Sequence, residues 1–275
     1  MLFSTSMKGV LCEAISDGRS LRDSCYSKSK ELQSLTMIMD KTIAVVVPAY
    51  NEERLIYGTL TTIPTFVDQI IVVDDASTDE TERLIGLAIQ GDRRIRWVKH
   101  CENRGVGAAI VSGYQAALDC KADIIAVMAG DGQMDAGDLY RIVEPVAMGE
   151  VDYAKGNRFI MPAIRYFGGL ILSWLTSVVC RTPILDSQSG YTAISRSILE
   201  QVPLNKLYPR YGFPNDILIK LSKVGARIKN VQTAPVYGNG EQSGIKIHKV
   251  IWPILGILGR GAWQRISPLR LIKSS

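Results

Sequence analysis

The sequence is poor in the residue types that build common metal sites and disulfide frameworks. It holds only two histidines, His100 and His248, which lie too far apart to form a two-histidine site on one helix. No CxxC or other metal-ligand spacing occurs among its cysteines, a pattern typical of free thiols in a reducing compartment. There are five of them: Cys12, Cys25, Cys101, Cys120 and Cys180.

Long apolar runs are also missing. Lys8, Glu13 and Asp17 interrupt the N-terminus before an apolar core of useful length can form, so we expect no secretory signal. The stretch 166–180 carries no charge, but as a helix it would span only about 22 Å, short of a hydrocarbon core of roughly 30 Å. We therefore expect no transmembrane span, and a 166–180 helix that lies on a membrane or packs in the core.

The composition is that of an ordinary globular protein of 275 residues, with 47% apolar and 21% charged residues and a net charge of +5. We predict a flexible extension over 1–40, a catalytic domain over 41–246 and a basic amphipathic segment over 247–275. From Gly244 onward the chain holds six basic residues and no acidic one. That segment is typical of a surface that meets anionic lipid, although a docked helix with a solvated basic face remains open. We expect no nucleic-acid partner, and the sequence does not predict the oligomeric state.

Apolar runs alternate with helical patterns from residue 42 onward. We predict four strands buried on both faces, with three helices between them. The first helix covers 51–63, the second begins at about residue 79 with Ser77 or Thr78 as its N-cap, and the third covers 105–118. The strands are Thr42–Val47, ended by Pro48, then Gln69–Val73, Ile95–Val98 and Asp123–Met128. This rhythm predicts an α/β fold with a mostly parallel twisted sheet flanked by helices. In such sheets ligands bind beyond the carboxyl ends of the strands, where polar residues gather here.

Asp131 and Gln133 follow the fourth strand and stand two residues apart, which places both on one side of an extended chain. One carboxylate and one amide oxygen form a partial set of ligands for Mg²⁺ or Mn²⁺, completed by phosphate oxygens and water. The alternative is a solvated Asp-Gly turn.

Asp74 and Asp75 end the second strand, and two adjacent carboxylates need a compensating donor such as a base or ribose. Capping of the next helix is the alternative for one of them. Glu52 follows the first strand and can meet the same ligand.

Two further motifs carry weaker signals. The segment 103–107 (NRGVG) lacks the third glycine of a dinucleotide fingerprint, so we interpret it as a tight turn that packs a helix on the sheet. Arg158 follows a short strand over 153–155, and both Arg158 and Arg165 offer paired donors to phosphate oxygens. Ion pairs with surface carboxylates are the alternative for these arginines.

Taken together, the motifs resemble family-2 glycosyltransferases of the dolichyl-phosphate mannose synthase-like branch. They cover roughly residues 42–247 in the family's order: VVVPAYNEE (45–53), IIVVDDASTDET (70–81), NRGVGAA (103–109), MAGDGQMD (128–135), GNRF (156–159), DSQSGYTAISR (186–196) and FPNDILIKL (213–221).

The resemblance implies a GT-A fold, with a Rossmann-like nucleotide-sugar half and an acceptor half, and it implies roles for individual residues. Around the nucleotide sugar it implies Pro48, Tyr50, Glu52, Asp74, Asp75 and Asp131. Asp131 and Gln133 would hold the metal. The acceptor phosphate would be faced by Arg158, with Arg165, Gln188 and Ser189. The catalytic residues would be Asp131, Arg158 and Asp186. Asp216 stands where the family usually has an acidic residue on a helix.

One departure from the family pattern concerns the metal motif. Its first aspartate is Ala129 here, so metal binding would depend on Asp131, Gln133 and the diphosphate. This change either weakens the affinity for free metal or marks an inactive relative.

The expected reaction is inverting, metal-dependent transfer of a hexose from a GDP- or UDP-sugar to a polyprenyl phosphate at the cytoplasmic face of a membrane. The acceptor phosphate is already anionic, so no strong general base is needed. A hydroxyl acceptor, with Asp186 or Asp216 as base, and a non-catalytic sugar-nucleotide-binding protein remain the alternatives.

Overall fold

The computed structural model describes residues 38, 40–158, 163–234 and 247–266, without the side chains of 163–168, 247–251 and 265–266. The chain divides into two compact units, residues 1–40 and 41–275. The extension predicted over 1–40 lies almost entirely outside the described residues. Everything below concerns the second unit.

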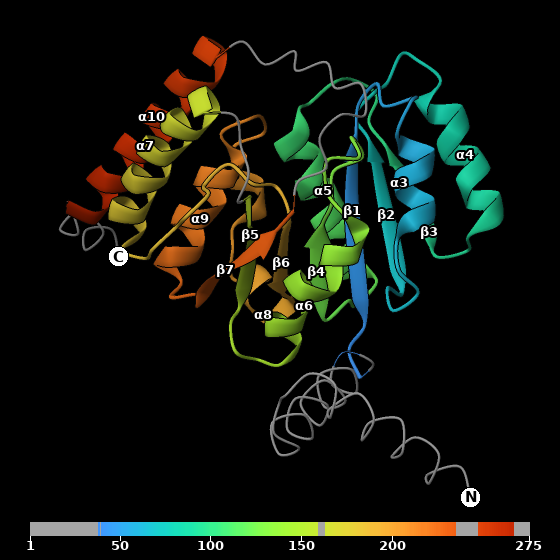
Figure 1. Cartoon of the computed structure of the whole chain (residues 1–275), viewed down its shortest axis with the longest axis horizontal. Coiled ribbons are helices and arrows are strands. Elements are labelled where there is room, and N and C mark those ends of the chain that lie inside the picture. The colour runs from blue at the N-terminus through green and yellow to red at the C-terminus, as the bar shows by residue number, and fades with distance from the viewer. Residues whose placement is uncertain (1–37, 39, 159–162, 235–246, 267–275) are drawn as a thin grey trace, which may run out of the picture. The chain divides into compact units, whose positions relative to one another are not determined.

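Strands and helices alternate through the first half of this unit, as the apolar pattern predicts (Figure 1). The strands are β1 (Ile43–Ala49), β2 (Gln69–Asp74), β3 (Ile95–Lys99), β4 (Ile124–Val127), β5 (Tyr153–Arg158), β6 (Thr192–Ser195) and β7 (Ile228–Thr233). The α-helices are α3 (Ile56–Thr62), α4 (Thr81–Gly91), α5 (Val106–Asp119), α6 (Leu139–Ala147), α7 (Ala163–Cys180), α8 (Arg196–Leu199), α9 (Phe213–Lys223) and α10 (Ile247–Ile266), and two short 3₁₀ turns are η1 (Ala136–Asp138) and η2 (Leu204–Lys206).

The strands form one sheet in the order β3-β2-β1-β4-β6-β5-β7. All neighbouring pairs are parallel except those of β6, which runs antiparallel to both β4 and β5. The chain places β2 and β3 on one side of β1 and then crosses to β4 on the other side. The point between β1 and β4 is therefore a topological switch point, where open α/β sheets bind ligands.

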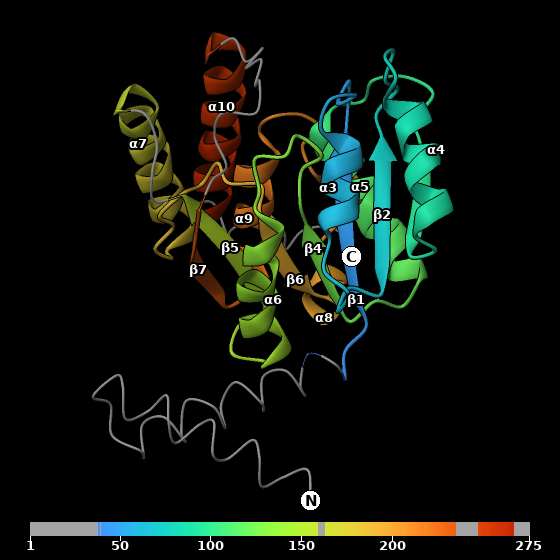
Figure 2. The same ribbon diagram turned by 45° about the vertical axis from the view of Figure 1, so that its right-hand side comes forward.

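Helices cover both faces of the sheet because its central strands are apolar on both faces (Figure 2). Ala44 and Val46 of β1 belong to the same core cluster as Ile110 and Tyr114 of α5, and the cluster continues into α9 and α10. The alternate residues of β1, including Val45 and Val47, are also fully buried. The mostly parallel sheet flanked by helices is thus confirmed.

Three predicted boundaries are wrong. β1 continues through Pro48 to Ala49, pairing with β2 as far as Asp74. The helix expected from residue 51 begins at Ile56, because Asn51 adopts a left-handed backbone with φ of 56°. Neither Ser77 nor Thr78 caps α4, whose N-cap residue is Glu80.

The helices α7 and α10 pack together and against α9, outside the sheet (Figures 1 and 2). No helix in the described ranges is long and apolar enough to cross a membrane. The C-terminal segment expected as a separate region begins with α10, whose Ile254, Ile257 and Leu258 are buried in the main core.

Candidate active site

The loops that follow β1 and β2 are joined to each other by hydrogen bonds. Asn51 N donates to Ser77 Oγ over 3.0 Å, and Asn51 Oδ1 accepts from Thr78 N over 2.8 Å. Glu52 N donates to Thr81 Oγ1 over 2.7 Å. Because these bonds use the polar groups of residues 77 and 78, they explain why neither residue caps α4. The loops together form one wall at the carboxyl end of the sheet, with Tyr50 exposed on it.

Glu52 and Asp131 bring two carboxyl groups together across the switch point, one from the loop after β1 and one from the loop after β4. Burial, followed by the negative charges of Asp131 and Asp79, raises the pKa of Glu52 from 4.5 to about 7. An excess of negative charge at this point favours a cation.

Asp131 and Gln133 lie in a tight turn and not in an extended chain. Gly132 has a φ of 67°, and Gln133 N donates to Asp131 Oδ1 over 3.1 Å. The Asp-Gly turn is therefore present, and the same-side argument for the two side chains does not apply. The turn nevertheless presents both residues beyond the end of β4, with Asp131 close enough to Glu52 to raise its pKa.

The residues at this point fit a divalent cation that is held partly by a ligand. Within the described ranges no cluster of three or more His, Cys, Asp or Glu side chains is arranged to hold a metal alone. The donors present are the carboxylate of Asp131, the carboxyl of Glu52 and the amide oxygen of Gln133. Magnesium commonly takes one or two protein carboxylates and fills its other positions with phosphate and water, which matches this set.

Asp74 and Asp75 avoid mutual repulsion by binding different donors. Asp74 Oδ1 accepts from Ser77 N and Oγ, at 3.0 and 2.5 Å, while its buried Oδ2 has no hydrogen-bond partner in the structure. Asp75 accepts from the backbone of the 103–107 turn, from Arg104 N at 2.9 Å and Gly105 N at 2.7 Å. Neither carboxylate caps α4. Asp75 holds the turn before α5, and among the described residues Asp74 is left with one buried acceptor oxygen.

A buried histidine completes the support of Asp75. His100 Nδ1 lies 2.6 Å from Asp75 Oδ1, and its Nε2 lies 2.9 Å from Ser112 Oγ on α5. The 103–107 turn also meets a distant segment, since Ala108 N donates to Pro209 O over 2.9 Å. Gly107 packs closely against that segment and not on the sheet as predicted: a Cβ at Gly107 would lie 2.4 Å from Tyr208 O, whereas α5 meets the sheet at Gly113, beside Val46.

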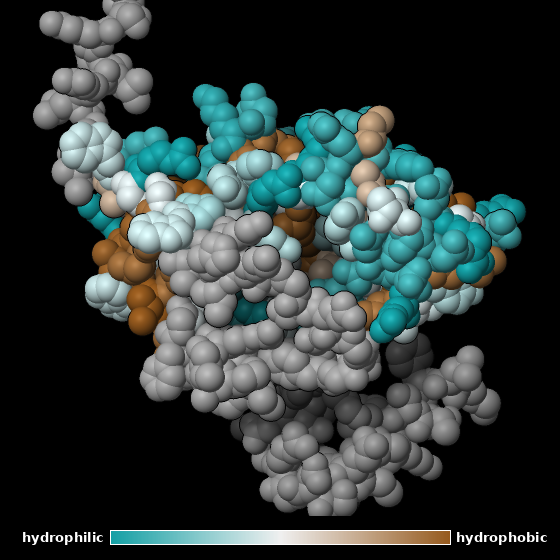
Figure 3. Space-filling view, turned by 90° about the horizontal axis from the view of Figure 1, so that it is seen from above, coloured by the Kyte–Doolittle hydropathy of each residue, from teal (hydrophilic) through white to brown (hydrophobic). Residues whose placement is uncertain are grey.

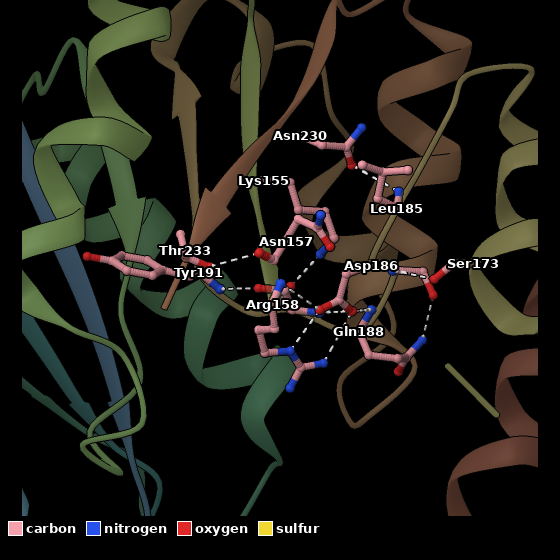
Figure 4. A network of polar contacts seen from close by, with 12 residues as sticks. Lys155, Asn157, Arg158, Ser173, Leu185, Asp186, Gln188, Tyr191, Asn230 and Thr233 are labelled. Carbon is pink, nitrogen blue, oxygen red and sulfur yellow. Dashed lines mark hydrogen bonds and ion pairs between the residues drawn. The ribbon is translucent and has the colours of Figure 1, made fainter. Parts of the chain in front are cut away.

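Arg158, at the end of β5, forms a two-point ion pair with Asp186 (Figure 4). Arg158 Nε lies 2.7 Å from Asp186 Oδ2, and its Nη2 lies 3.2 Å from Oδ1. Asp186 is 4% exposed, so this is not the surface pair considered as an alternative. Burial alone would raise the pKa of Asp186, but the hydrogen bonds and charge of Arg158, with Lys155, hold that pKa below its ordinary value.

Lys155 is fully buried beneath this pair, and its ammonium group donates to Ser189 O. Burial lowers the pKa of Lys155 to about 8, against the opposing effect of Asp186. The lysine was not predicted, because a lone lysine inside a strand gives no signal in the sequence. It ties β5 to the loop over 186–190.

The loop over 186–190 is held by hydrogen bonds within itself and to the neighbouring helices α7 and α9. Asp186 Oδ1 accepts from Gln188 N and Ser189 N, at 3.0 and 3.1 Å. The Gln188 side chain donates to Asn215 Oδ1 of α9 over 2.8 Å, and Ser187 N donates to Ser173 Oγ of α7 over 2.9 Å. The loop is therefore pre-positioned, and it connects directly to the outer helix α7.

A small cleft is lined by the loop after β4, the end of β5, the loop over 186–190 and the end of β7. Its lining residues are Gln133, Met134, Arg158, Ser189, Gly190, Tyr191, Thr233 and Ala234. The predicted metal-side residue Gln133 and the predicted acceptor-side residues Arg158 and Ser189 thus share one cavity. Tyr191, which donates to Asp135 O over 2.9 Å, was not singled out in the sequence.

Three predicted residues lie elsewhere or are only partly described. Arg165 lies in α7, but its side chain is outside the described residues. Pro48 is a buried residue of β1 whose carbonyl accepts from Gly130 N over 3.1 Å. Asp216 pairs with Lys220 at 2.5 Å and accepts from Tyr208 N at 2.8 Å, away from the cleft.

The sequence is similar, over most of its length, to proteins whose names state an activity. The chain is 29% identical over 218 residues to a UDP-N-acetylglucosamine–dolichyl-phosphate N-acetylglucosaminyltransferase of Methanococcus voltae, covering 72% of this chain and 87% of the relative. It is 28% identical to a polyprenol monophosphomannose synthase of Mycolicibacterium smegmatis, covering 78% and 87%.

The fold also matches a solved structure. The glucosyl-3-phosphoglycerate synthase of Mycobacterium tuberculosis, crystallised with Mg²⁺ and uridine diphosphate, aligns with a TM-score of 0.66 at 21% identity, over 84% of this chain and 83% of that one. At that identity the likeness shows the fold alone, and it confirms the GT-A architecture. Residues 44–202, more than half of the chain, match the model described as glycosyl transferase family 2. The chain therefore belongs to glycosyltransferase family 2 and is an enzyme that binds a nucleotide sugar.

Proposed function

We propose that this enzyme transfers a hexose or N-acetylhexosamine from a nucleoside diphosphate sugar to a polyprenyl phosphate, with inversion and with the help of Mg²⁺ or Mn²⁺. The observation that carries the proposal is the composition of the cleft, where Gln133, from the turn that also holds Asp131, shares one lining with Arg158 and Ser189. The names of the two relatives support a polyprenyl phosphate acceptor and leave the sugar open.

The donor occupies the wall made by the loops after β1, β2 and β4. Asp74 Oδ2 is a buried acceptor without a partner in the structure, which suits an N–H of the base or a ribose hydroxyl. The exposed Tyr50 and the carboxyl of Glu52, both in the loop after β1, would contact the same ligand beyond the buried Pro48. Asp75 acts indirectly by holding the 103–107 turn.

Asp131, Gln133 and Glu52 would hold the metal together with the diphosphate. When bound, the ion offsets the charge of the leaving nucleoside diphosphate. Burial is the main cause of the raised pKa of Glu52, and a cation next to Asp131 would lower that pKa by offsetting the added repulsion from Asp131. Ala129 leaves the protein with one carboxylate fewer, so the diphosphate supplies a larger share of the ligands.

The acceptor phosphate binds at Arg158, with Ser189 and Gln188 shaping the loop beside it. Two of the guanidinium's nitrogens are held by Asp186, which fixes the orientation of the group. An oxygen of the acceptor phosphate attacks the anomeric carbon, the bond from that carbon to the diphosphate breaks, and the nucleoside diphosphate leaves with the electron pair. One displacement inverts the anomeric configuration.

The alternative of a hydroxyl acceptor needs a general base, and the candidates are poorly suited to this role. Asp186 is buried, its oxygens accept five hydrogen bonds, and its pKa is held below the ordinary value. Asp216 pairs with Lys220 outside the cleft. These observations support the phosphate acceptor, and they leave the non-catalytic alternative to experiment.

A membrane surface is part of the proposal. Apolar side chains point outward from α7 and α10, and hydrophobic residues gather at that edge of the molecule, at the left of Figure 3. The exposed ones are Leu170, Ile171, Trp174, Val178, Trp252, Leu255 and Trp263. We propose peripheral binding through this face, at the cytoplasmic side of the membrane, where nucleotide sugars are available to the cleft.

The test is radiolabelled transfer into organic-extractable lipid, with GDP-mannose, UDP-glucose and UDP-N-acetylglucosamine as donors and Mg²⁺ or Mn²⁺ present. We expect labelling with one donor, lost on chelation and lowered at least a hundredfold by Asp131→Asn and by Arg158→Ala. Donor binding without transfer under every condition would support the non-catalytic alternative.

A further inference from the structure

A second and larger groove lies between α9, α10 and the segment 203–209. Its volume is about 530 Å³, within the range of small-molecule sites. It shares no lining residue with the catalytic cleft. The residues that line it are Pro203, Asn205, Lys206, Leu207, Tyr208, Pro209, Asp216, Ile219, Lys220, Lys223, Val224, Ile257, Arg260, Gly261 and Gln264.

The charge of this groove is strongly positive. It holds four basic side chains, those of Lys206, Lys220, Lys223 and Arg260, and a single acidic one, Asp216. Asp216 is already paired with Lys220 at 2.5 Å. Across the described ranges, neither Lys206 nor Arg260 forms an ion pair. The groove therefore has an excess of cationic donors for an anionic ligand.

Apart from the amides of Asn205 and Gln264, most of the remaining lining is apolar, and the groove adjoins the outward apolar face of α10. Ile219 and Ile257 line it beside the basic groups. Arg260 stands three residues before Trp263, so the two side chains are neighbours along the helix. Trp263 is 70% exposed. A ligand held at Arg260 would thus extend toward the face that exposes tryptophan.

We propose that this groove binds the phosphate headgroup of an acidic phospholipid, as a site separate from the one that binds substrates. Arg260 and Lys206 supply donors to the phosphodiester oxygens, and the apolar residues contact the glycerol and the first acyl carbons. The inference rests on the proposed membrane surface and deepens it, because it gives the protein a preference for anionic over neutral lipid.

The first test is sedimentation with vesicles of phosphatidylcholine, alone or mixed with phosphatidylglycerol. Lys206→Gln combined with Arg260→Gln should lower affinity for the mixed vesicles by roughly tenfold or more and leave binding to neutral vesicles unchanged. The matched control is Arg93→Gln with Arg96→Gln, which removes the same charge from exposed positions at the β3 edge of the sheet. An equal loss in both double variants, or a loss in neither, would overturn the proposal.

The second test uses short-chain phosphatidylglycerol below its micelle concentration, with inorganic phosphate as the comparison, followed by NMR of groove residues. Shifts with the lipid, absent in Lys206→Gln/Arg260→Gln, are expected. Equal shifts with inorganic phosphate would contradict a lipid site and indicate a general anion site.

Sugar transfer to a short-chain polyprenyl phosphate in detergent separates the two proposals. The groove variant should retain wild-type transfer there. If the protein binds acidic lipid selectively but transfers no sugar, the lipid site is supported and the proposed function is rejected. If it transfers sugar but shows no lipid selectivity, the proposed function is supported and the lipid site is rejected.

Discussion

Among single residues, Glu52 couples the stability of the donor side to pH. Its pKa is raised from 4.5 to about 7 by burial and by Asp131 and Asp79. Between these values the folded protein keeps a proton that the unfolded chain has released, so the free energy of unfolding falls as pH rises from about 4.5 to about 7. Above that range this contribution is constant.

Glu52→Gln should remove this dependence and stabilise the protein at pH above 7 by about 1 kcal/mol, after allowance for solvent screening. Urea denaturation on both sides of the window measures the effect, with exposed Glu102→Gln as control. A metal ion with donor should raise the melting temperature of the wild type more than that of the variant. Identical pH dependence in the variant would contradict the assigned pKa.

A second prediction concerns the Arg158–Asp186 pair. Arg158→Gln leaves a buried carboxylate without its main partner and should cost roughly 3 kcal/mol of unfolding free energy. Adding Asp186→Asn should restore part of the stability, because the stranded charge is removed, but none of the transfer activity.

Denaturant unfolding and the transfer assay, run on the two single variants and the double variant, separate the roles. Recovery of transfer in the double variant would mean that Arg158 serves only to neutralise Asp186. All three variants retain Lys155 beneath the loop, so they differ from one another only at positions 158 and 186.

The role of a residue can be predicted from the sequence where the motif that indicates it is local. The strand-end positions of Glu52, Asp74 and Asp131 follow from motifs next to apolar runs. The support from Lys155, His100 and Asn215 could not be predicted, because each acts across a long stretch of sequence through a contact that only the fold creates.

At the scale of elements, the glycine turn before α5 depends on close backbone contact. A Cβ on Gly107 would lie 2.4 Å from Tyr208 O and 2.8 Å from Phe213 Cβ, so Gly107→Ala forces the turn and the 208–213 segment apart. We expect a loss of roughly 2–3 kcal/mol in unfolding free energy.

Gly86→Ala is the matched control, because Gly86 lies inside α4 with open space around its Cα. It should stabilise the protein by about 0.5–1 kcal/mol through helix propensity. Chemical denaturation of both variants tests the contrast. Equal effects would show that the 103–107 turn is not closely packed.

The sequence predicts elements best where apolar runs are continuous. β1, β2 and β4 are buried on both faces and were located to within about two residues, as is usual for strong patterns. The start of α3 was missed because the left-handed backbone of Asn51 is stabilised by Thr78 from another loop, which no local pattern reveals. Likewise, the antiparallel placement of β6 follows from pairing between distant segments.

At the scale of the whole molecule, α7 links the proposed membrane face to the loop over 186–190, since Ser173 of α7 holds Ser187. Trp174, Trp252 and Trp263 are at least 65% exposed on α7 and α10. Replacing Trp252 and Trp263 by serine should weaken vesicle binding at least tenfold, because each indole contributes favourable burial at the lipid interface.

Leu87→Ser, at an exposed apolar position of α4, is the control and should leave vesicle binding unchanged. Transfer to an acceptor in vesicles should fall with the tryptophan variant, while transfer to a short-chain acceptor in solution is retained. Unchanged vesicle binding in the tryptophan variant would exclude the exposed face of α10 as a membrane contact.

The central claim is that the acceptor group is a phosphate that Arg158 neutralises and that needs no general base. The most direct measurement compares transfer from the preferred donor to a polyprenyl phosphate and to the polyprenol of the same chain length. We predict sugar transfer to the phosphate alone, with inverted anomeric configuration in the product. Transfer to the polyprenol at a comparable rate would contradict the proposed chemistry and require a base that the Arg158–Asp186 arrangement does not provide.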